Sequence, residues 1–314
     1  MCGIVGIGTS NTKHVEPRWV RKMCASITRR GPDDEGYFFS DHVGLGMRRL
    51  AIIDVRSGQQ PVHNEDKSIW VVFNGEIYNY KELQTQLQER GHVLKTSSDT
   101  ECLVHLYEDF GDEFVGQLRG MFAFAIWDSR QEKLLLGRDR LGIKPLYYSE
   151  YGGDFFFGSE LKCLLNAPGF NRKINLKAVS EYFSFKYVPG PQTIYEQVKE
   201  LPPAHLCVWR KGRLEIKRYW TFSPQPDYQK PFEHFRDGLL HHLKEAVSLH
   251  LVSEVPLGAF LSGGIDSSAI VAVMSQQGGA APKTFTVGFG EGQMGVDERP
   301  FARTIAHQYS TDHS

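Results

Sequence analysis

The sequence predicts an α+β domain followed by an α/β domain with a parallel sheet. The chain has 314 residues, which leaves room for two domains of about 150 residues each. The first two hundred residues hold mostly short β-type runs separated by turn residues. Beyond residue 231, strand and helix patterns alternate as they do in βαβ units. We therefore assign residues 1–217 to the first domain, 218–230 to a linker and 231–314 to the second domain.

The first domain is expected to stack its strands as sheets with helices outside. One helix is predicted at 79–90, where Leu83 and Leu87 follow helical spacing and Gly91 can end the helix. A second helix is predicted at 100–110, and a hairpin loop at 128–131. The predicted strands lie at residues 2–7, 44–47, 51–53, 69–73, 121–127, 133–137 and 155–157.

The pattern changes after Pro202-Pro203. A hairpin is predicted at 207–217 around Lys211-Gly212, and the proline-containing stretch 223–227 predicts a linker. Strands at 257–261 and 284–288 and helices at 267–276 and 298–308 follow a long amphipathic helix, whose apolar face is Phe232, Phe235, Leu239, Leu243 and Val247. Because two parallel strands cannot bury both faces of a sheet, we expect this chain to be a piece of a longer protein.

Composition excludes several classes of protein. The 36 basic and 37 acidic side chains give a net charge of −1, so no basic excess indicates nucleic-acid binding. No apolar run approaches the ~18 residues of a membrane span, and the start lacks a secretory signal. Five scattered cysteines without a CxxC pair indicate neither zinc nor a disulfide framework. We expect a soluble, cytoplasmic protein with no nucleic-acid or membrane partner.

Most cysteines and histidines carry no functional signal. Cys24, Cys102, Cys163 and Cys207 are interpreted as packing residues. The histidines that show no metal-ligand spacing are His14, His42, His63, His92 and the pair His241-His242.

Met1-Cys2-Gly3 is the most informative tripeptide. A small second residue allows removal of Met1, which would leave Cys2 with a free α-amino group. That amine has a pKa of about 7.7–8 and the thiol one of about 8.5. One residue would then supply both a nucleophile and a general base, as in N-terminal-nucleophile hydrolases. The alternative is that Cys2 is only a buried residue of the first strand.

Four further segments supply polar groups. Arg49, expected to begin an apolar strand, offers a planar fork for a carboxylate. Residues 74–76, Asn-Gly-Glu, place an amide, a bare backbone and a carboxylate at a strand end. Asp99 stands just before a helix, where capping is the alternative role, and segment 30–34 is either a turn or a mobile lid. Together with Cys2, they predict a pocket for an α-amino acid with a side-chain carbonyl.

A second candidate site lies in the second domain. Residues 262–268, Ser-Gly-Gly-Ile-Asp-Ser-Ser, join an apolar strand to a helix. Backbone N–H groups, hydroxyls and a helix N-terminus together make an anion cradle. The loop lacks the GK[ST] of a Walker A loop, and a plain glycine-serine turn is the alternative.

The first domain resembles the glutaminase domain of class II glutamine amidotransferases, specifically in the glutamine-dependent asparagine synthetase family. The matching segments, in order over residues 1–162, are MCGIVGI, RRGPDDEG, RRLAIID, FNGEIYN, SSDTE, RGMFAFAIWD, GRDRLGIKPLYY and FGSELK. This resemblance implies an N-terminal-nucleophile αββα sandwich. The 262–268 loop resembles the pyrophosphate loop of ATP pyrophosphatases, so the second domain would be the first part of a parallel-sheet domain of that type.

The resemblance also implies a role for individual residues. Cys2 would attack the side-chain amide of glutamine, while Asn74 and Gly75 would stabilise the oxyanion. The remaining glutamine-binding groups would be Arg49 for the α-carboxylate, Glu76 and Asp99 for the α-ammonium, and the backbone around Leu50, Ile52 and Ile53. Segments 137–145 and 159–162 would form a passage for ammonia, or alternatively a structural ion-pair turn.

In the second domain the resemblance implies binding of ATP and Mg²⁺ as substrate and metal, with no prosthetic group. The implied ATP-binding residues are Leu261, Ser262, Gly263, Gly264, Asp266, Ser267, Ser268 and Val287, with Asp266 near the magnesium. In the family, ATP adenylates aspartate with release of pyrophosphate, and ammonia displaces AMP to give asparagine.

Two alternatives stay open, and the resemblance adds one expectation about assembly. The acceptor can be another carboxylate, such as a sugar uronate or a peptide carboxylate, or the chain can be a non-catalytic interaction domain. We expect the residues that select the acceptor to lie beyond residue 314, so the chain would hydrolyse glutamine without making asparagine. Since members of this family are often dimers, a homodimer is the expected assembly.

Overall fold

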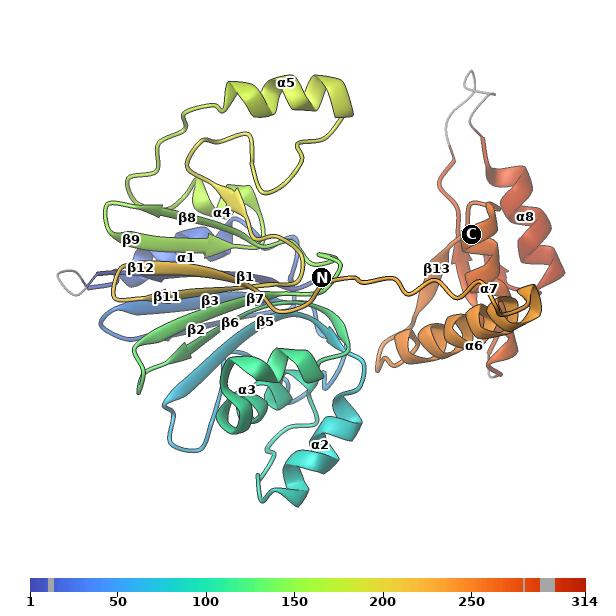
Figure 1. Ribbon diagram of the computed structural model, residues 1–314, viewed down its shortest axis with the longest axis horizontal. Helices are drawn as coiled ribbons and strands as arrows, with labels where there is room; N and C mark the ends of the chain where they lie inside the picture. The colour runs from blue at the N-terminus through green and yellow to red at the C-terminus, as the bar shows by residue number, and fades with distance from the viewer. Residues whose placement is uncertain (11–13, 279, 289–296) are drawn as a thin grey trace. The chain divides into compact units, whose positions relative to one another are not determined.

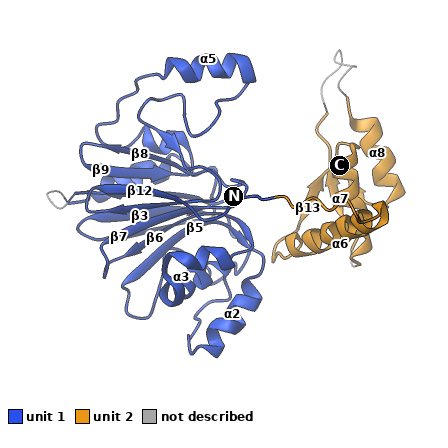
Figure 2. Cartoon of the chain, in the orientation of Figure 1, with its two compact units in different colours: residues 1–223 blue, residues 224–314 orange. Residues whose placement is uncertain are grey.

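A computed structural model describes residues 1–10, 14–278, 280–288 and 297–314. The chain divides into two compact units, Met1–Ser223 and Pro224–Ser314 (Figure 2). The first unit contains two large sheets with helices, and the second contains a small sheet with three helices among its described residues.

Two six-stranded antiparallel sheets form the centre of the first unit (Figure 1). The first sheet has the order β10-β8-β9-β1-β3-β2 and the second the order β12-β11-β7-β6-β5-β4. The strands of the first sheet are β1 Gly3–Gly8, β2 Asp34–Phe39, β3 Val43–Arg49, β8 Tyr147–Tyr151, β9 Asp154–Gly158 and β10 Lys199–Glu200. Those of the second are β4 Val62–His63, β5 Ile69–Ile77, β6 Gly120–Asp128, β7 Lys133–Arg138, β11 His205–Arg210 and β12 Arg213–Arg218.

The two sheets face each other across the main core, which contains Ile4 and Leu45 from the first sheet and Val72 and Leu136 from the second. Helices α1 (Pro17–Ala25) and α4 (Leu161–Leu164) pack on the outer face of the first sheet. Helix α3 (Asp99–Phe110) covers the outer face of the second sheet, and α2 (Tyr80–Glu89) and the 3₁₀ helix η1 (Gly111–Gln117) pack against α3 (Figure 1). This order of layers confirms the predicted αββα sandwich.

Local sequence explains why several of these elements form. Strand β6 is buried from Phe122 to Asp128 because it lies between β5 and β7 with both faces covered, and such strands are apolar throughout. The predicted hairpin between β11 and β12 is confirmed: Lys211 and Gly212 have φ angles of 49° and 76°, as a two-residue type I′ turn requires.

Two strand predictions around the pocket were wrong. Residues 51–53 form no strand, and Arg49 ends β3 instead of beginning a strand. The reason is that the Arg49 guanidinium binds the carbonyl oxygens of Ile53, Asp54 and Val55, so this segment wraps around the side chain. Strand β5 continues to Ile77, and residues 74–76 therefore lie within a strand that pairs with β6.

Segment 30–34 packs onto β3 and leads into β2. Arg48 Nε donates to the Gly31 carbonyl at 3.0 Å, and the Ala51 N–H donates to Asp33 Oδ2 at 2.9 Å. Asp34 already pairs with Arg49 in the first sheet. Of the two predicted alternatives, a turn fits these contacts.

The elements of the first unit that the sequence analysis missed are α1, β2, β4, η1, β8, α4, β10 and helix α5 (Leu176–Phe185). Strands β4 and β10, with two residues each, and α4, with four, are too short to show a hydrophobic period. Helix α1 does show one, in Val20, Met23 and Cys24, and it was overlooked. The four cysteines outside the pocket, Cys24, Cys102, Cys163 and Cys207, are buried free thiols, which fits their interpretation as packing residues.

The second unit carries a three-stranded parallel sheet, β13-β14-β15, of Gly258–Phe260, Lys283–Phe285 and Asp312–His313. Its helices are α6 (Phe232–His250), α7 (Ile265–Gln276) and α8 (Arg299–Gln308). The predicted parallel βαβ arrangement is confirmed, and β15 adds a third strand that the sequence analysis did not predict. Among the described helices, none is both long and apolar enough to cross a membrane.

The predicted apolar face of α6 is only half correct. Val247 is buried against Val273 and Met274 of α7, with Leu243 packed beside them. Phe232 and Leu239, in the first half of the helix, are 73% and 72% exposed. The difference arises because α7 covers only the C-terminal part of α6.

Candidate active site

One pocket of the first unit collects every residue that the sequence analysis assigned to glutamine. Its walls come from the first residues of the chain, the end of β3 with the following loop, the middle of β5, the start of α3, and Lys144. The lining residues are Met1, Cys2, Arg49, Leu50, Ile52, Ile53, Gly58, Gln60, Phe73, Asn74, Gly75, Glu76, Ser98, Asp99, Thr100 and Lys144.

Cys2 lies just before β1 and is held on two sides. Its Sγ accepts a hydrogen bond from the Leu50 N–H at 3.4 Å and lies 3.6 Å from the Leu50 carbonyl oxygen. Burial raises the pKa of the thiol, and burial also lowers the pKa of the amino group of Met1. A thiol in this environment stays neutral until a nearby base removes its proton.

Arg30 fixes the backbone of Cys2, a role that the sequence analysis did not assign. Its Nε donates to the Cys2 carbonyl at 2.8 Å, and its Nη1 forms an ion pair with Glu160 Oε1 at 3.1 Å. The side chain is only 10% exposed. The sequence contained a signal for this role, since Arg30 begins the segment that was interpreted as a turn or lid.

Arg49 is 5% exposed, and the backbone around it fixes its guanidinium. Its Nη2 donates to the carbonyls of Ile53 and Asp54 at 3.1 and 2.7 Å, and its Nη1 donates to Val55 at 3.4 Å. A Cβ at Gly58 would lie 2.5 Å from Nη2, so glycine is needed beside the guanidinium. Because a guanidinium has five N–H groups, these three bonds leave Nε and one Nη1 hydrogen to bind a carboxylate.

Asn74 carries a buried amide whose two polar atoms are both unpaired. The residue is 1% exposed, and neither Oδ1 nor Nδ2 has a hydrogen-bond partner among the described residues. Buried side-chain amides are nearly always hydrogen-bonded, so each exception requires an explanation. A substrate oxygen that accepts from Nδ2 would satisfy this group.

The backbone N–H of Gly75 points away from β6. Phe122, its partner in the register, donates its N–H to Asp139 Oδ2 and accepts with its carbonyl from the Asp139 N–H, at 3.1 and 2.9 Å. The Gly75–Phe122 pair is therefore a non-hydrogen-bonded pair of the ladder. On the same edge of β5, the N–H of Phe73 donates to Gln60 Oε1 and that of Ile77 to Asp99 Oδ2. The Gly75 N–H lies between them, at the pocket.

Glycine is required at position 75 for a reason that the sequence analysis did not anticipate. A Cβ there would lie 2.2 Å from the Met121 carbonyl oxygen and 2.8 Å from the Phe122 Cα. Such contacts would push β5 away from β6. The close approach that requires a glycine is therefore to the neighbouring strand β6.

Asp99 is the first residue of α3, and the capping role belongs to Ser98, whose Oγ accepts from the Thr100 N–H at 3.2 Å. The Asp99 carboxylate turns instead to β5, where its Oδ2 accepts from the Ile77 N–H at 2.9 Å. Burial, together with the nearby Glu76 charge, raises the pKa of Asp99 to about 6. A carboxyl of this kind binds a cation most strongly once it is ionised.

Gln60 and Lys144 also line the pocket and were not predicted as site residues. Gln60 accepts from the Phe73 N–H at 2.7 Å, and its Nε2 donates to Thr100 Oγ1 at 3.3 Å, so it joins β5 to α3. Lys144 is 5% exposed, and burial lowers its pKa. Gln60 has no sequence signal, whereas Lys144 stood within the segment assigned to an ammonia passage.

That segment, 137–145, has the contacts of a structural turn. Arg138 donates to the carbonyls of Lys144, Leu201 and Gly142 at 2.6–2.8 Å and pairs with Glu200 at 2.8 Å. Asp139, 1% exposed, accepts from four backbone N–H groups, which belong to Phe122, Leu141, Ile143 and Lys144. These bonds occupy four of the five N–H groups of Arg138 and both oxygens of Asp139, and they favour the structural alternative over an ammonia passage.

The loop predicted to bind ATP lies at the carboxyl end of β13, where parallel sheets bind ligands. Gly263 has a φ of +80°, and a Cβ there would lie 2.5 Å from the Phe301 Cβ, so only glycine fits. The Ser262 and Ser267 hydroxyls lie 2.9 Å apart, and the Gly264 N–H donates to Ser262. The Ser268 hydroxyl is buried without a hydrogen-bond partner in the part of the chain that the structure describes.

Of the remaining predicted ATP residues, Leu261 precedes the loop, Asp266 lies within it and Val287 follows β14. The Leu261 carbonyl accepts from the Thr286 hydroxyl at 2.5 Å. Val287 lies past the end of β14 and is 67% exposed. Asp266 is exposed in the first turn of α7. The single carboxylate of Asp266 fits Mg²⁺, which takes one or two protein carboxylates together with substrate phosphates. The Ser268 hydroxyl, which has no partner among the described residues, could donate a hydrogen bond to a phosphate oxygen.

Comparison with known proteins is consistent with both units. Residues 1–220 match the family model described as glutamine amidotransferase domain, and residues 238–314 match that described as asparagine synthase. Asparagine synthetase 1 (glutamine-hydrolyzing) of Bacillus subtilis (strain 168) is 40% identical over 313 residues, which cover 98% of this chain and 48% of the relative. Asparagine synthetase 3 of the same organism is 34% identical over 329 residues, with 100% and 53% covered.

A further relative and a solved structure extend the comparison. Amidase chry2 of Gibberella zeae is 35% identical over 306 residues, with 91% of this chain and 45% of the relative covered. The chain spans about half the length of these relatives. The glutamine phosphoribosylpyrophosphate amidotransferase from B. subtilis, complexed with ADP and GMP, aligns with a TM-score of 0.54 at 15% identity, over 99% of this chain and 90% of that one. At this identity the likeness concerns the fold.

Proposed function

Since the chain belongs to the glutamine-dependent asparagine synthetase family, we propose that its first unit hydrolyses the side-chain amide of glutamine. Cys2 is the nucleophile once Met1 has been removed. The observation that carries this proposal is the buried, unpaired amide of Asn74 in the same pocket as the Cys2 thiol. A scaffold without catalysis has no need for such an amide, because it leaves two polar atoms unsatisfied.

The substrate is held at its two charged ends. The N–H groups of Arg49 that its bonds to backbone carbonyls leave unused donate charge-assisted hydrogen bonds to the α-carboxylate. Glu76 and Asp99 bind the α-ammonium, and the incoming cation favours the ionised form of Asp99. This places the side-chain amide of glutamine toward Cys2, Asn74 and Gly75.

The reaction then proceeds through a thioester. The α-amino group of Cys2 takes the thiol proton as Sγ attacks the amide carbon, and the C=O bond becomes an oxyanion. Asn74 Nδ2 and the Gly75 N–H donate to that oxyanion, and one such donor is worth about 3–4 kcal/mol of barrier. The proton passes to the leaving nitrogen, and ammonia departs. Water then attacks the thioester to give glutamate and restore the thiol.

For the whole protein, we propose that the ammonia is used to amidate a carboxylate that ATP has activated. The loop at 262–268 would bind the phosphates, with the Ser268 hydroxyl and the α7 N-terminus as donors and Asp266 holding Mg²⁺. The magnesium, when bound, neutralises phosphate charge. Aspartate is the acceptor that the family supports best. Another relative of comparable identity is named Amidase chry2 and not asparagine synthetase. A carboxylate other than aspartate is therefore our second candidate for the acceptor.

The experiment that tests the glutaminase is glutamate release from glutamine by the chain, after mass spectrometry has established loss of Met1. We expect turnover in the wild-type chain and in Cys24→Ala, a matched thiol change on α1 outside the pocket. Cys2→Ala should abolish turnover. A folded chain with a free Cys2 that releases no glutamate, or a Cys2→Ala variant that still does, would overturn the proposal and favour the non-catalytic alternative.

A further inference from the structure

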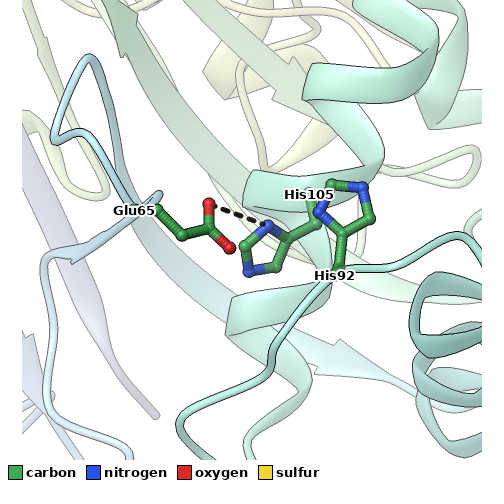
Figure 3. A group of neighbouring side chains, drawn as sticks. All are labelled: Glu65, His92 and His105. Atoms are coloured by element: carbon green, nitrogen blue, oxygen red, sulfur yellow. Dashed lines mark ion pairs between the residues drawn. The ribbon is translucent and has the colours of Figure 1, made fainter.

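Three side chains that the proposed reaction does not use gather beside helix α3 (Figure 3). Glu65 lies in the turn between β4 and β5, His92 follows α2, and His105 lies in the middle of α3. One oxygen or nitrogen from each lies within 4.8 Å of those from the other two. The three residues are far apart in sequence, so no spacing motif pointed to them.

The two imidazoles have different neighbours on their two nitrogens. His92 donates from Nε2 to Asp109 Oδ1 at 3.1 Å, which leaves Nδ1 as the lone-pair nitrogen, and Figure 3 shows the His92 ring beside that of His105. The ring centroids are 4.7 Å apart. His105 Nδ1 lies 3.9 Å from Glu65 Oε2 and 3.2 Å from a Glu108 oxygen.

A carboxylate outside the trio lies beside the outer nitrogen of each ring. Asp109 fixes the tautomer of His92 through the bond to Nε2. The other nitrogen of His105, Nε2, is buried without a hydrogen-bond partner among the described residues and lies 3.7 Å from Glu101 Oε1. Metal-bound histidines characteristically donate their outer N–H to a carboxylate, which orients the ring and raises its basicity.

We propose that Glu65, His92 and His105 bind a divalent metal ion of the zinc class. Two imidazole nitrogens and a carboxylate oxygen are ligands that Zn²⁺ prefers, at about 2.0–2.2 Å each. Ligand atoms around a tetrahedral ion then lie about 3.3 Å apart, so the present separations, 3.9 Å between Glu65 and His105 and up to 4.8 Å within the trio, must shorten when the ion binds. Glu65, whose side chain is 50% exposed, is free to move toward the two imidazoles. When the ion binds His105 Nδ1, it displaces the proton that faces Glu108 Oε2 at 3.2 Å. The ring then carries a proton on Nε2, which faces Glu101.

The site would join three segments around the start of α3. The loop that carries His92 continues into residues 95–98, where the N–H groups of Lys95 and Thr96 already donate to Glu101 at 2.9 and 2.7 Å. Asp99 follows directly and lies in the glutamine pocket. Metal binding would therefore stabilise the wall of the pocket formed by α3, without contact with substrate.

The test measures metal binding by the full chain in a Cys2→Ala background, so that the pocket thiol does not compete. After removal of metal with a chelator, Co²⁺ is titrated and its visible spectrum recorded, and Zn²⁺ binding is measured by calorimetry. We expect one ion per chain with the absorption of four-coordinate Co²⁺. Glu65→Gln and His92→Ala should each weaken binding at least about tenfold, and Asp109→Asn should weaken it less.

Glu65→Gln is the safest of these variants, because its side chain is half exposed and the metal-free fold does not depend on it. The double variant His241→Ala, His242→Ala serves as the control, since these residues and Glu245 form the other such group among the described residues. It should bind Co²⁺ and Zn²⁺ like the parent. Absence of a saturable 1:1 site, binding unchanged in Glu65→Gln and His92→Ala, or binding lost only in the control would each overturn the proposal. In that case the two histidines serve only in their hydrogen bonds to Asp109 and Glu108.

Discussion

The Asp99 carboxylate accepts a hydrogen bond from the backbone N–H of Ile77 at 2.9 Å, which ties the first residue of α3 to the last residue of β5. Gln60 does the same at Phe73, four residues earlier on the same strand edge. The Gly75 N–H is left between these two bonds. On this edge of β5, the N–H groups of Phe73 and Ile77 are thus bound by side chains, and the Gly75 N–H between them is left for the oxyanion of the proposed reaction.

Asn74→Ala should separate activity from stability. We expect kcat for glutamate release to fall about 10²–10³-fold with little change in KM, because a donor to the oxyanion is lost. The free energy of unfolding should stay equal or increase, since the amide has no hydrogen bond to lose among the described residues. Assays of glutamate release measure kcat and KM, and urea denaturation measures the free energy of unfolding. A large loss of stability, or an unchanged kcat, would show that Asn74 is a structural residue.

The pH dependence of glutamine binding should report Asp99. Because burial raises its pKa to about 6, kcat/KM should fall about tenfold per pH unit below that value, as the carboxyl becomes neutral and ceases to attract the α-ammonium. In Asp99→Asn, kcat/KM should be low at every pH and lack this acid limb. An acid limb that survives in Asp99→Asn would assign it to another group.

The same carboxyl should make stability depend on pH in the opposite direction from most aspartates. The folded state holds the proton with a pKa of about 6, against 3.8 for an ordinary aspartate, so the folded state binds more protons between these values. The free energy of unfolding should therefore decrease as pH rises from about 4 to 6, by at most about 3 kcal/mol from this group. Asp99→Asn lacks this effect, so its stability relative to wild type should increase over that range. Urea denaturation at pH 4.5 and 7.5 checks this, and a constant difference would contradict it.

Gly75→Ala should destabilise the first unit by about 1–3 kcal/mol. The new Cβ would lie 2.2 Å from the Met121 carbonyl oxygen, and the backbone of the neighbouring strand cannot give way cheaply. Gly116→Ala is the matched control, because nothing lies within 4 Å of a Cβ there. Chemical denaturation of the two variants should differ clearly. Equal stability would mean that β5 and β6 can separate without cost.

Arg30→Gln should lower kcat about 10- to 100-fold, because loss of the bond to the Cys2 carbonyl lets the thiol move away from the pocket, and small misplacements of reacting groups are costly. Glu160→Gln removes the ion pair and keeps the bond from Arg30 Nε to Cys2 at 2.8 Å, so its kcat should change much less. Comparable decreases of kcat in both variants would indicate that the Arg30–Glu160 ion pair, and not the hydrogen bond from Arg30 to the Cys2 carbonyl, supports catalysis.

The sequence by itself determined the kinds of domain and the chemical groups of the pocket. Strands 2–7 and 121–127, the hairpin at Lys211-Gly212 and the alternation after residue 231 follow from local period and turn chemistry, which neighbouring residues fix. Cys2, Arg49, Asn74 and Asp99 were identified because their side chains carry distinctive chemistry.

Only the tertiary structure decided how these groups are held. That Arg49 ends a strand, that Gly75 is required by Met121, that Arg30 and Gln60 support the pocket, and that Glu65, His92 and His105 meet beside α3 all depend on segments distant in the chain. Local patterns carry no information about such pairs, because a hydrogen bond or a steric contact between two segments exists only once the sheets have stacked and fixed their register.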